Sequence, residues 1–196
     1  MDRVHSLGDS WCCIETPTGV NRGWQVYAGL LPEHRHGMPG STAAQWAADD
    51  GGILSRALAT MRPGDIVFVS LVGNDILHAI ADGTLTFPEI GAARSALARV
   101  VDTLVAAKLR VILMGYGHPR TDKFGSDIAV WGLCFLIRHV AQEAGTEYLP
   151  LADILVAEDH FAGTDIHPTE AGHRAIAAAV VAAARRSNVI AADWRR

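Results

Sequence analysis

Two polar segments at opposite ends of the chain contain the residue types that can activate a serine. Ser10 lies in Gly8-Asp9-Ser10, directly after a short apolar run, and His167 lies in Asp165-Ile166-His167 near the other end. A serine hydroxyl becomes a nucleophile when an imidazole accepts its proton, and a carboxylate behind the imidazole holds the ring in the required tautomer. We therefore expect Ser10 as nucleophile, His167 as general base and Asp165 as the acid that orients the base.

The elements that must bring these segments together alternate along the chain. Buried strands are predicted from apolar runs, and helices from segments of helical spacing between them. Such alternation implies parallel strands joined by helical crossovers in one doubly wound domain, here residues 1–196. The predicted strands are Val4–Leu7, Val26–Leu31, Ile66–Val72, Val111–Gly115 and Glu147–Leu151, and the predicted helices are Ser41–Ala48, Ile53–Met61, Pro88–Ala107, Ser126–Ala144 and Pro168–Arg186.

Two further segments follow predicted strands and therefore reach the same edge of the sheet as Ser10. Gly40 lies in a glycine-containing segment before a helix start, where its backbone N–H can bind an anion. Asn74, in Gly73-Asn74-Asp75, offers a side-chain amide that can donate to an oxyanion. A nucleophile, a base and two kinds of oxyanion donor are thus predicted to meet at one sheet edge, as a serine hydrolase requires.

The order of these motifs, Gly-Asp-Ser, Gly-x-x-Gly-x-Thr, Gly-Asn-Asp and Asp-x-His-Pro, resembles the SGNH (GDSL-type) esterase and lipase family over nearly the whole chain. The resemblance implies a flavodoxin-like three-layer α/β/α sandwich with a five-stranded parallel sheet. It also implies hydrolysis of esters or thioesters through Ser10, whose own N–H joins Gly40 and Asn74 in the oxyanion hole, with His167 as base. No cofactor or metal is implied.

The chain departs from the family pattern at two positions. The family normally places its acid three residues before the histidine, where this chain has Thr164, and it has a glycine where this chain has Val72. Asp165 reaches the imidazole only if its loop is not extended, because residues i and i+2 of a strand project to the same side. Asp159 and a Ser-His pair oriented by a backbone carbonyl or water are the alternatives.

Several nearby polar residues have simpler interpretations. Asp9 and Asp75 are expected to hydrogen-bond their own loops or neighbouring strand ends, and Thr42 to cap the following helix. His34 and His36 are expected on a solvated loop. His173 lies six residues after His167, a spacing that does not align two metal ligands on one helical face, and is expected to pack or to face solvent.

The amino-acid composition limits the kinds of partner that we expect. The 196 residues carry a net charge of −4 without clustered Lys and Arg, which argues against nucleic acid. No apolar run is long enough to cross a bilayer, and no zinc-type spacing is present. The three cysteines and the early first strand after Met1 predict a cytoplasmic protein. We expect a small-molecule ester as substrate, and the sequence predicts no oligomeric state. The alternative is a flavodoxin-like ligand-binding domain that has lost turnover.

Overall fold

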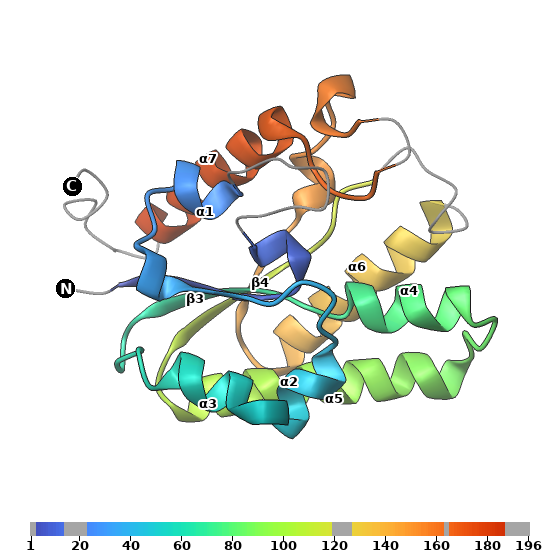
Figure 1. The fold of residues 1–196 in the computed structure, drawn as a ribbon, viewed down its shortest axis with the longest axis horizontal. Helices are drawn as coiled ribbons and strands as arrows, with labels where there is room; N and C mark the ends of the chain where they lie inside the picture. Colours follow the sequence, from blue (N-terminus) through green and yellow to red (C-terminus); the bar gives the residue numbers. More distant parts are fainter. Residues whose placement is uncertain (1–2, 14–22, 119–126, 163–164, 187–196) are drawn as a thin grey trace.

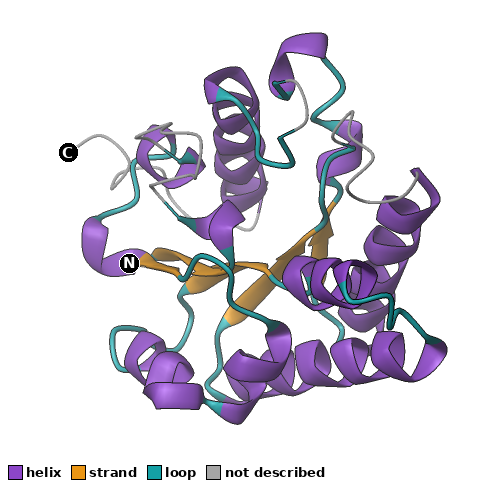
Figure 2. Ribbon diagram, turned by 45° about the vertical axis from the view of Figure 1, so that its right-hand side comes forward, coloured by secondary structure: helices purple, strands orange, loops and turns teal. Residues whose placement is uncertain are grey.

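The computed structural model describes residues 3–13, 23–118, 127–162 and 165–186. Within these residues, parallel strands form a five-stranded sheet in the order β2-β1-β3-β4-β5. Figure 2 shows the strands in orange, with helices around them. The strands are β1 (Val4–Gly8), β2 (Arg35–Gly37), β3 (Ile66–Ser70), β4 (Arg110–Met114) and β5 (Glu147–Leu149). The α-helices are α1 (Trp24–Tyr27), α2 (Ala43–Ala48), α3 (Ile53–Leu58), α4 (Gly73–Ala81), α5 (Phe87–Ala106), α6 (Asp127–Glu143) and α7 (Glu170–Arg186).

The sheet is the middle layer of three. Helices α1 and α7 pack on each other over one face, while α2, α3 and α5 cover the other face (Figure 1). Helix α5 also packs against α4 and α6. The fold is therefore a flavodoxin-like α/β/α sandwich, and the predicted fold class is confirmed.

Strand β1 lies where the chain changes direction across the sheet. The chain leaves β1 for β2 on one side and then crosses to β3 on the other, so β1 pairs with both. All five residues of β1 and of β3 are buried, as expected for parallel strands covered on both faces. Ligands of open α/β sheets bind beyond the carboxyl end of the strands at such a reversal, which here is the end occupied by Ser10.

The carboxyl end of β1 requires a glycine. Gly8 has a φ of +147°, and a Cβ on this residue would lie 1.9 Å from the carbonyl oxygen of Ser70 on β3. The absence of a side chain lets the two strand ends approach closely. The Asp9 N–H donates to the same Ser70 carbonyl at 2.9 Å, which fixes the turn that follows.

The predicted strand Val26–Leu31 is wrong. Its first residues belong to the short helix α1, which ends at Tyr27 and is followed by Gly29 with a φ of +77°. The Leu30 N–H donates to the Gln25 carbonyl at 2.9 Å and closes the helix end. A short apolar run of this kind has no period that separates a strand from a buried helical turn.

The strand in its place is β2, whose sequence Arg35-His36-Gly37 has none of the apolar character used to predict strands. It is an edge strand of three residues that pairs only with β1. The other predicted strands and helices are present, with ends shifted by a few residues. Helix α4 was not predicted, and it begins directly at Gly73.

Candidate active site

Ser10, His167 and Asp165 form one chain of hydrogen bonds. His167 Nε2 lies 2.9 Å from Ser10 Oγ, and His167 Nδ1 lies 2.8 Å from Asp165 Oδ1. A carboxylate only accepts, so Nδ1 carries the proton and Nε2 is free to accept from the serine hydroxyl. Asp165 is thus the carboxylate that reaches the imidazole. Asp159 is exposed, and it approaches this segment through its backbone carbonyl, which accepts from the Thr169 hydroxyl.

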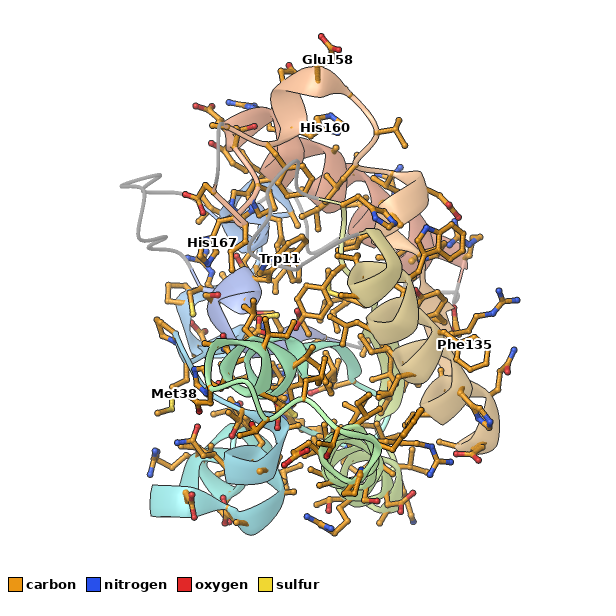
Figure 3. The ribbon with its side chains drawn as sticks, turned by 90° about the vertical axis from the view of Figure 1, so that its right-hand side faces the viewer. Trp11, Met38, Phe135, Glu158, His160 and His167 are labelled. Atoms are coloured by element: carbon orange, nitrogen blue, oxygen red, sulfur yellow. The ribbon has the colours of Figure 1, made fainter. Side chains whose placement is uncertain are left out.

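Local structure holds the serine in a tight turn. Ser10 is the first residue of a 3₁₀-helix, Ser10–Cys12, that Asp9 caps by accepting from the Trp11 N–H at 3.0 Å. Only 8% of Ser10 is exposed, and His167 is equally buried. Figure 3 shows the His167 side chain beside Trp11, far from Phe135 on α6. The expectation that Asp9 bonds its own loop and a neighbouring strand end is confirmed by its bonds to Trp11 and Ser70.

The loops of Gly40 and Asn74 are joined to the serine turn by hydrogen bonds. The Gly8 carbonyl accepts from the Met38 N–H at 2.8 Å, which attaches the Gly40 loop to the end of β1. Asn74 Nδ2 donates to the carbonyl of Ser41 at 2.8 Å, which attaches the Asn74 loop to the Gly40 loop. An amide nitrogen has two N–H groups, so one remains for a further acceptor.

The backbone donors proposed from the sequence are unoccupied within the described residues. No hydrogen bond joins the N–H of Ser10 or of Gly40 to another residue of that part of the chain. Gly40 is exposed and has a φ of +73°, which a glycine adopts without strain. The three donor groups and the Ser10 hydroxyl therefore lie on the serine turn, the Gly40 loop and the first turn of α4, and hydrogen bonds join these segments.

The Asn74 loop contains a strained residue. Val72, which precedes α4, has a φ of +89°, a conformation that is an outlier for a β-branched side chain. Such strain persists only where surrounding contacts impose it. Asp75, in the first turn of α4, accepts from the N–H groups of Ala43 and Ala44 at 2.8 and 3.3 Å, and so joins this turn to the start of α2.

Asp9 lies at the centre of a buried network behind Ser10. Its carboxylate accepts from Trp11 N–H, from the Ser70 hydroxyl at 3.3 Å and from the Tyr116 hydroxyl. Complete burial raises the pKa of Asp9 to about 7, although these hydrogen bonds oppose the rise. Sequence reasoning missed Tyr116, because it follows β4 without any motif to mark it.

The histidines outside this chain of hydrogen bonds lie in the packed interior or on a strand. His173 is fully buried on α7, and neither ring nitrogen has a hydrogen-bond partner among the described residues. The expectation of a solvated loop for His34 and His36 is wrong. His34 is buried, and His36 lies on β2 with its Nε2 3.3 Å from Nδ1 of His5 on β1. No cluster of metal-ligating side chains suited to an ion exists in the described part of the chain.

A cavity of about 440 Å³ lies on the far side of α6, between that helix and the end of β5. Its lining includes His118 and Trp131, together with Arg138 and Asp153, but neither Ser10 nor His167. It is thus separate from the chain of hydrogen bonds at Ser10. Among the described residues, none of the helices has the length and hydropathy needed to cross a membrane.

Comparison with known protein families agrees with this geometry. The model of the GDSL-like lipase/acylhydrolase family matches residues 6–175. The chain belongs to this family. As a member of the GDSL-like family it is a carboxylic ester hydrolase, and the resemblance drawn from the four motifs is confirmed. A comparison with curated protein sequences found no match.

Solved structures of esterases share the fold of this GDSL-like chain. An acetylxylan esterase from Geobacillus stearothermophilus is 15% identical, with a TM-score of 0.69, over 92% of this chain and 93% of that one. The esterase EstA from Pseudoalteromonas is 13% identical, with a TM-score of 0.67, over 96% and 99% of the two chains. The acetyl xylan esterase AlAXEase is 14% identical, with a TM-score of 0.67, over 92% and 98%.

Proposed function

We propose that this chain hydrolyses short-acyl carboxylic esters through an acyl-enzyme on Ser10, with His167 as general base and Asp165 as the orienting acid. The observation that carries the proposal is the continuous hydrogen-bond chain from Ser10 Oγ through His167 to Asp165 Oδ1. A serine that only satisfied its own loop would not need an imidazole in the tautomer that accepts its proton.

The reaction has two halves of the same form. His167 Nε2 takes the proton of Ser10 as Oγ bonds to the acyl carbon, and the carbonyl electrons move onto oxygen to give a tetrahedral oxyanion. The oxyanion collapses, the ester C–O bond breaks, and His167 returns the proton to the leaving alcohol. Water then attacks acyl-Ser10 with His167 again as base, and the carboxylic acid and free Ser10 are released.

Three donors in this proposal bind the oxyanion: the backbone N–H groups of Ser10 and Gly40 and the remaining amide N–H of Asn74. The support is that the two backbone groups have no partner among the described residues, while the Ser41 carbonyl holds the Asn74 amide in place. Donors fixed before the reaction stabilise developing charge without a reorganisation cost. Each is expected to act mainly on kcat, because the oxyanion forms only in the transition state.

Acetylated carbohydrates are the substrate class that we propose to test first. Two of the esterases with a similar fold are described as acetyl xylan esterases, which is the support for this choice. Thioesters are a second class with the same acyl chemistry. The connection between Trp11 and Trp24 is short and polar and lacks the large apolar lid of an enzyme that works on a lipid surface, which supports short acyl groups. Most of this connection, residues 14–22, lies outside the described residues.

The experiment compares hydrolysis of p-nitrophenyl acetate, butyrate and octanoate and of acetylated xylo-oligosaccharides by the wild type and by Ser10→Ala. Ser95→Ala is the matched control, because Ser95 is exposed on α5 and bonds only the preceding turn at Gly91. We expect Ser10→Ala to lose at least about 10³-fold in kcat, with acetate the best acyl group. A fluorophosphonate should label the wild type and Ser95→Ala but not Ser10→Ala. Equal activity in Ser10→Ala, or an unlabelled wild type, would contradict the proposal.

A further inference from the structure

The hydroxyl of Tyr116 connects the two loops that carry the nucleophile and the oxyanion donor. It donates to Oδ2 of Asp9, the residue directly before Ser10. It also accepts from the N–H of Gly73, the residue directly before Asn74, at 3.1 Å. Tyr116 itself follows β4, so a third segment of the sheet edge holds the other two at a fixed separation.

The Tyr116 phenol has one proton, and the ionised Asp9 carboxylate only accepts. Gly73 N–H can only donate, so the hydroxyl accepts there and its single proton goes to the Asp9 carboxylate. Burial and the adjacent Asp9 charge raise the pKa of Tyr116 well above its usual range, which keeps the proton on the phenol. One hydroxyl therefore bonds both the Asp9 carboxylate and the Gly73 N–H, and it also contacts the Ser70 hydroxyl.

The Tyr116 ring is closely packed. Tyr116 is 2% exposed, and its ring meets Trp11 edge to face at 5.0 Å between centroids. A Cβ on Gly73 would lie 2.8 Å from the Tyr116 hydroxyl oxygen, so the contact depends on glycine at this position. Tyrosine at 116 and glycine at 73 thus fit each other sterically as well as by the hydrogen bond.

The loop on the Gly73 side does not hold its shape by local preference. Val72 has the strained φ of +89° next to the Gly73 N–H that Tyr116 accepts. Strain of this kind persists only where contacts from the surrounding structure impose it. The Tyr116 hydroxyl provides one such bond at the residue adjacent to the strained one, and the Ser41 carbonyl provides another at Asn74.

We propose that Tyr116 is a positioning residue for the ester hydrolysis described above, which sets the distance between the Ser10 turn and the Asn74 amide. The inference rests on the proposed function, since it assigns Tyr116 a role through Ser10 and Asn74. A shift of well under 1 Å in a donor weakens a transition-state contact while substrate binding is little affected. The effect of removing the hydroxyl should therefore appear in kcat rather than in KM.

The first test is the steady-state kinetics of Tyr116→Phe on p-nitrophenyl acetate. We expect kcat to fall about tenfold, with KM within about twofold of the wild type, because Asn74 is misaligned rather than lost. Tyr148→Phe is the matched control and should retain wild-type kcat, since Tyr148 lies on β5 and lines the separate cavity behind α6. Urea unfolding of each variant verifies that the assays are made on folded protein.

Ser70→Ala distinguishes a bridge from mere support of Asp9. The Ser70 hydroxyl also donates to Asp9 and contacts Tyr116, but it makes no bond to Gly73. If Tyr116 only supported the Asp9 carboxylate, Ser70→Ala and Tyr116→Phe should lower kcat by similar factors. The bridge predicts a clearly larger loss for Tyr116→Phe, and equal losses would overturn it.

A double-mutant cycle with Asn74→Ala gives the decisive result. If Tyr116 acts by aligning Asn74, Tyr116→Phe should cost less than about twofold in kcat once Asn74 is alanine. An additive tenfold loss in that background would overturn the inference, as would wild-type kcat in Tyr116→Phe. Asp9→Asn, whose amide turns a donor toward the Tyr116 hydroxyl, serves as the second variant if Tyr116→Phe does not fold. Ser10-dependent activity of the wild type is measured separately, so a failure of the proposed function is recognised by its own result.

Discussion

Asp165 contacts His167 twice, because its Oδ1 accepts both from the backbone N–H of His167 at 2.9 Å and from the imidazole Nδ1 at 2.8 Å. The backbone bond closes a turn of the Asx type, which brings a side chain next to groups two residues further on. A carboxylate two positions before the histidine can therefore orient the ring. The same oxygen fixes the loop and the tautomer.

Replacing Asp165 by asparagine should lower kcat about 10³-fold, because the amide no longer stabilises the imidazolium or fixes the tautomer that accepts from Ser10. The measurement is kcat for p-nitrophenyl acetate. Asp159→Asn is the matched control, since Asp159 is exposed and uses its backbone carbonyl near this segment. Comparable losses in the two variants, or none in Asp165→Asn, would remove Asp165 from the proposed mechanism.

The candidate site could be predicted in its main parts because its residues follow strands. Parallel strands place their carboxyl ends at one edge, so Ser10 after β1 and Asn74 after β3 are expected at the same edge of the sheet. The acid could not be chosen from the sequence, because the choice depends on the turn that Asp165 closes with its own side chain. Tyr116 could not be found at all, since its role depends on contacts with two distant loops.

The fold was predictable where strands are buried on both faces. The prediction failed at the edge of the sheet. The sequence of β3 begins with four consecutive apolar residues, Ile66-Val67-Phe68-Val69, a pattern typical of a strand that is buried on both faces. At β2, the edge position requires only backbone pairing with β1, so Arg35-His36-Gly37 has no apolar pattern. The apolar run at Val26 was therefore taken for the missing strand.

Removing the Asn74 amide should reduce kcat about 10²–10³-fold with a small change in KM, the usual cost of one oxyanion donor. Asn74→Ala tests the loss of the donor. Asn74→Asp replaces the donor by a carboxylate that repels the oxyanion, so its kcat should be at least as low. A carboxylate variant more active than Asn74→Ala would be inconsistent with a donor role for this side chain.

Gly8→Ala should destabilise the fold strongly. The new methyl group would lie 1.9 Å from a backbone oxygen of β3, at a φ of +147° that other residues rarely adopt. We expect a loss of more than about 4 kcal/mol in the free energy of unfolding, measured by urea titration. Gly132→Ala, at an exposed position of α6, is the control, because nothing lies within 4 Å of the place that its methyl group would take. That variant should gain about 0.5–1 kcal/mol from helix propensity.

Protonation of the imidazoles of His5 on β1 and His36 on β2 should destabilise the folded protein in mild acid. Burial, with repulsion from His34 for both, lowers the pKa of His5 and of His36 to about 4. His5 Nε2 lies 3.1 Å from Asp65 Oδ2, so Nε2 carries the proton and Nδ1 accepts from His36 at 3.3 Å. Both rings fit their hydrogen bonds in the neutral form.

The sign of the pH dependence follows from proton uptake. Between pH about 6.5 and 4, the unfolded chain protonates these histidines and the folded chain does not, so the free energy of unfolding falls as the pH falls through this window. Asp9, whose pKa is raised to about 7 by burial, acts in the opposite direction and partly offsets the loss. The difference between the wild type and a variant in His36 removes that contribution.

His36→Gln keeps an N–H donor for His5 Nδ1 but does not titrate. Urea unfolding at pH 7.5 and 5.0 should show a wild-type loss that is about 1 kcal/mol larger than the loss in His36→Gln; one fully buried histidine would give about 2 kcal/mol, and His36 is half-buried. Ser95→Ala, at an exposed position of α5, removes no titratable group and is the control, which should lose as much as the wild type. Identical losses in all three proteins would mean that His36 is protonated in the folded state as easily as in the unfolded chain.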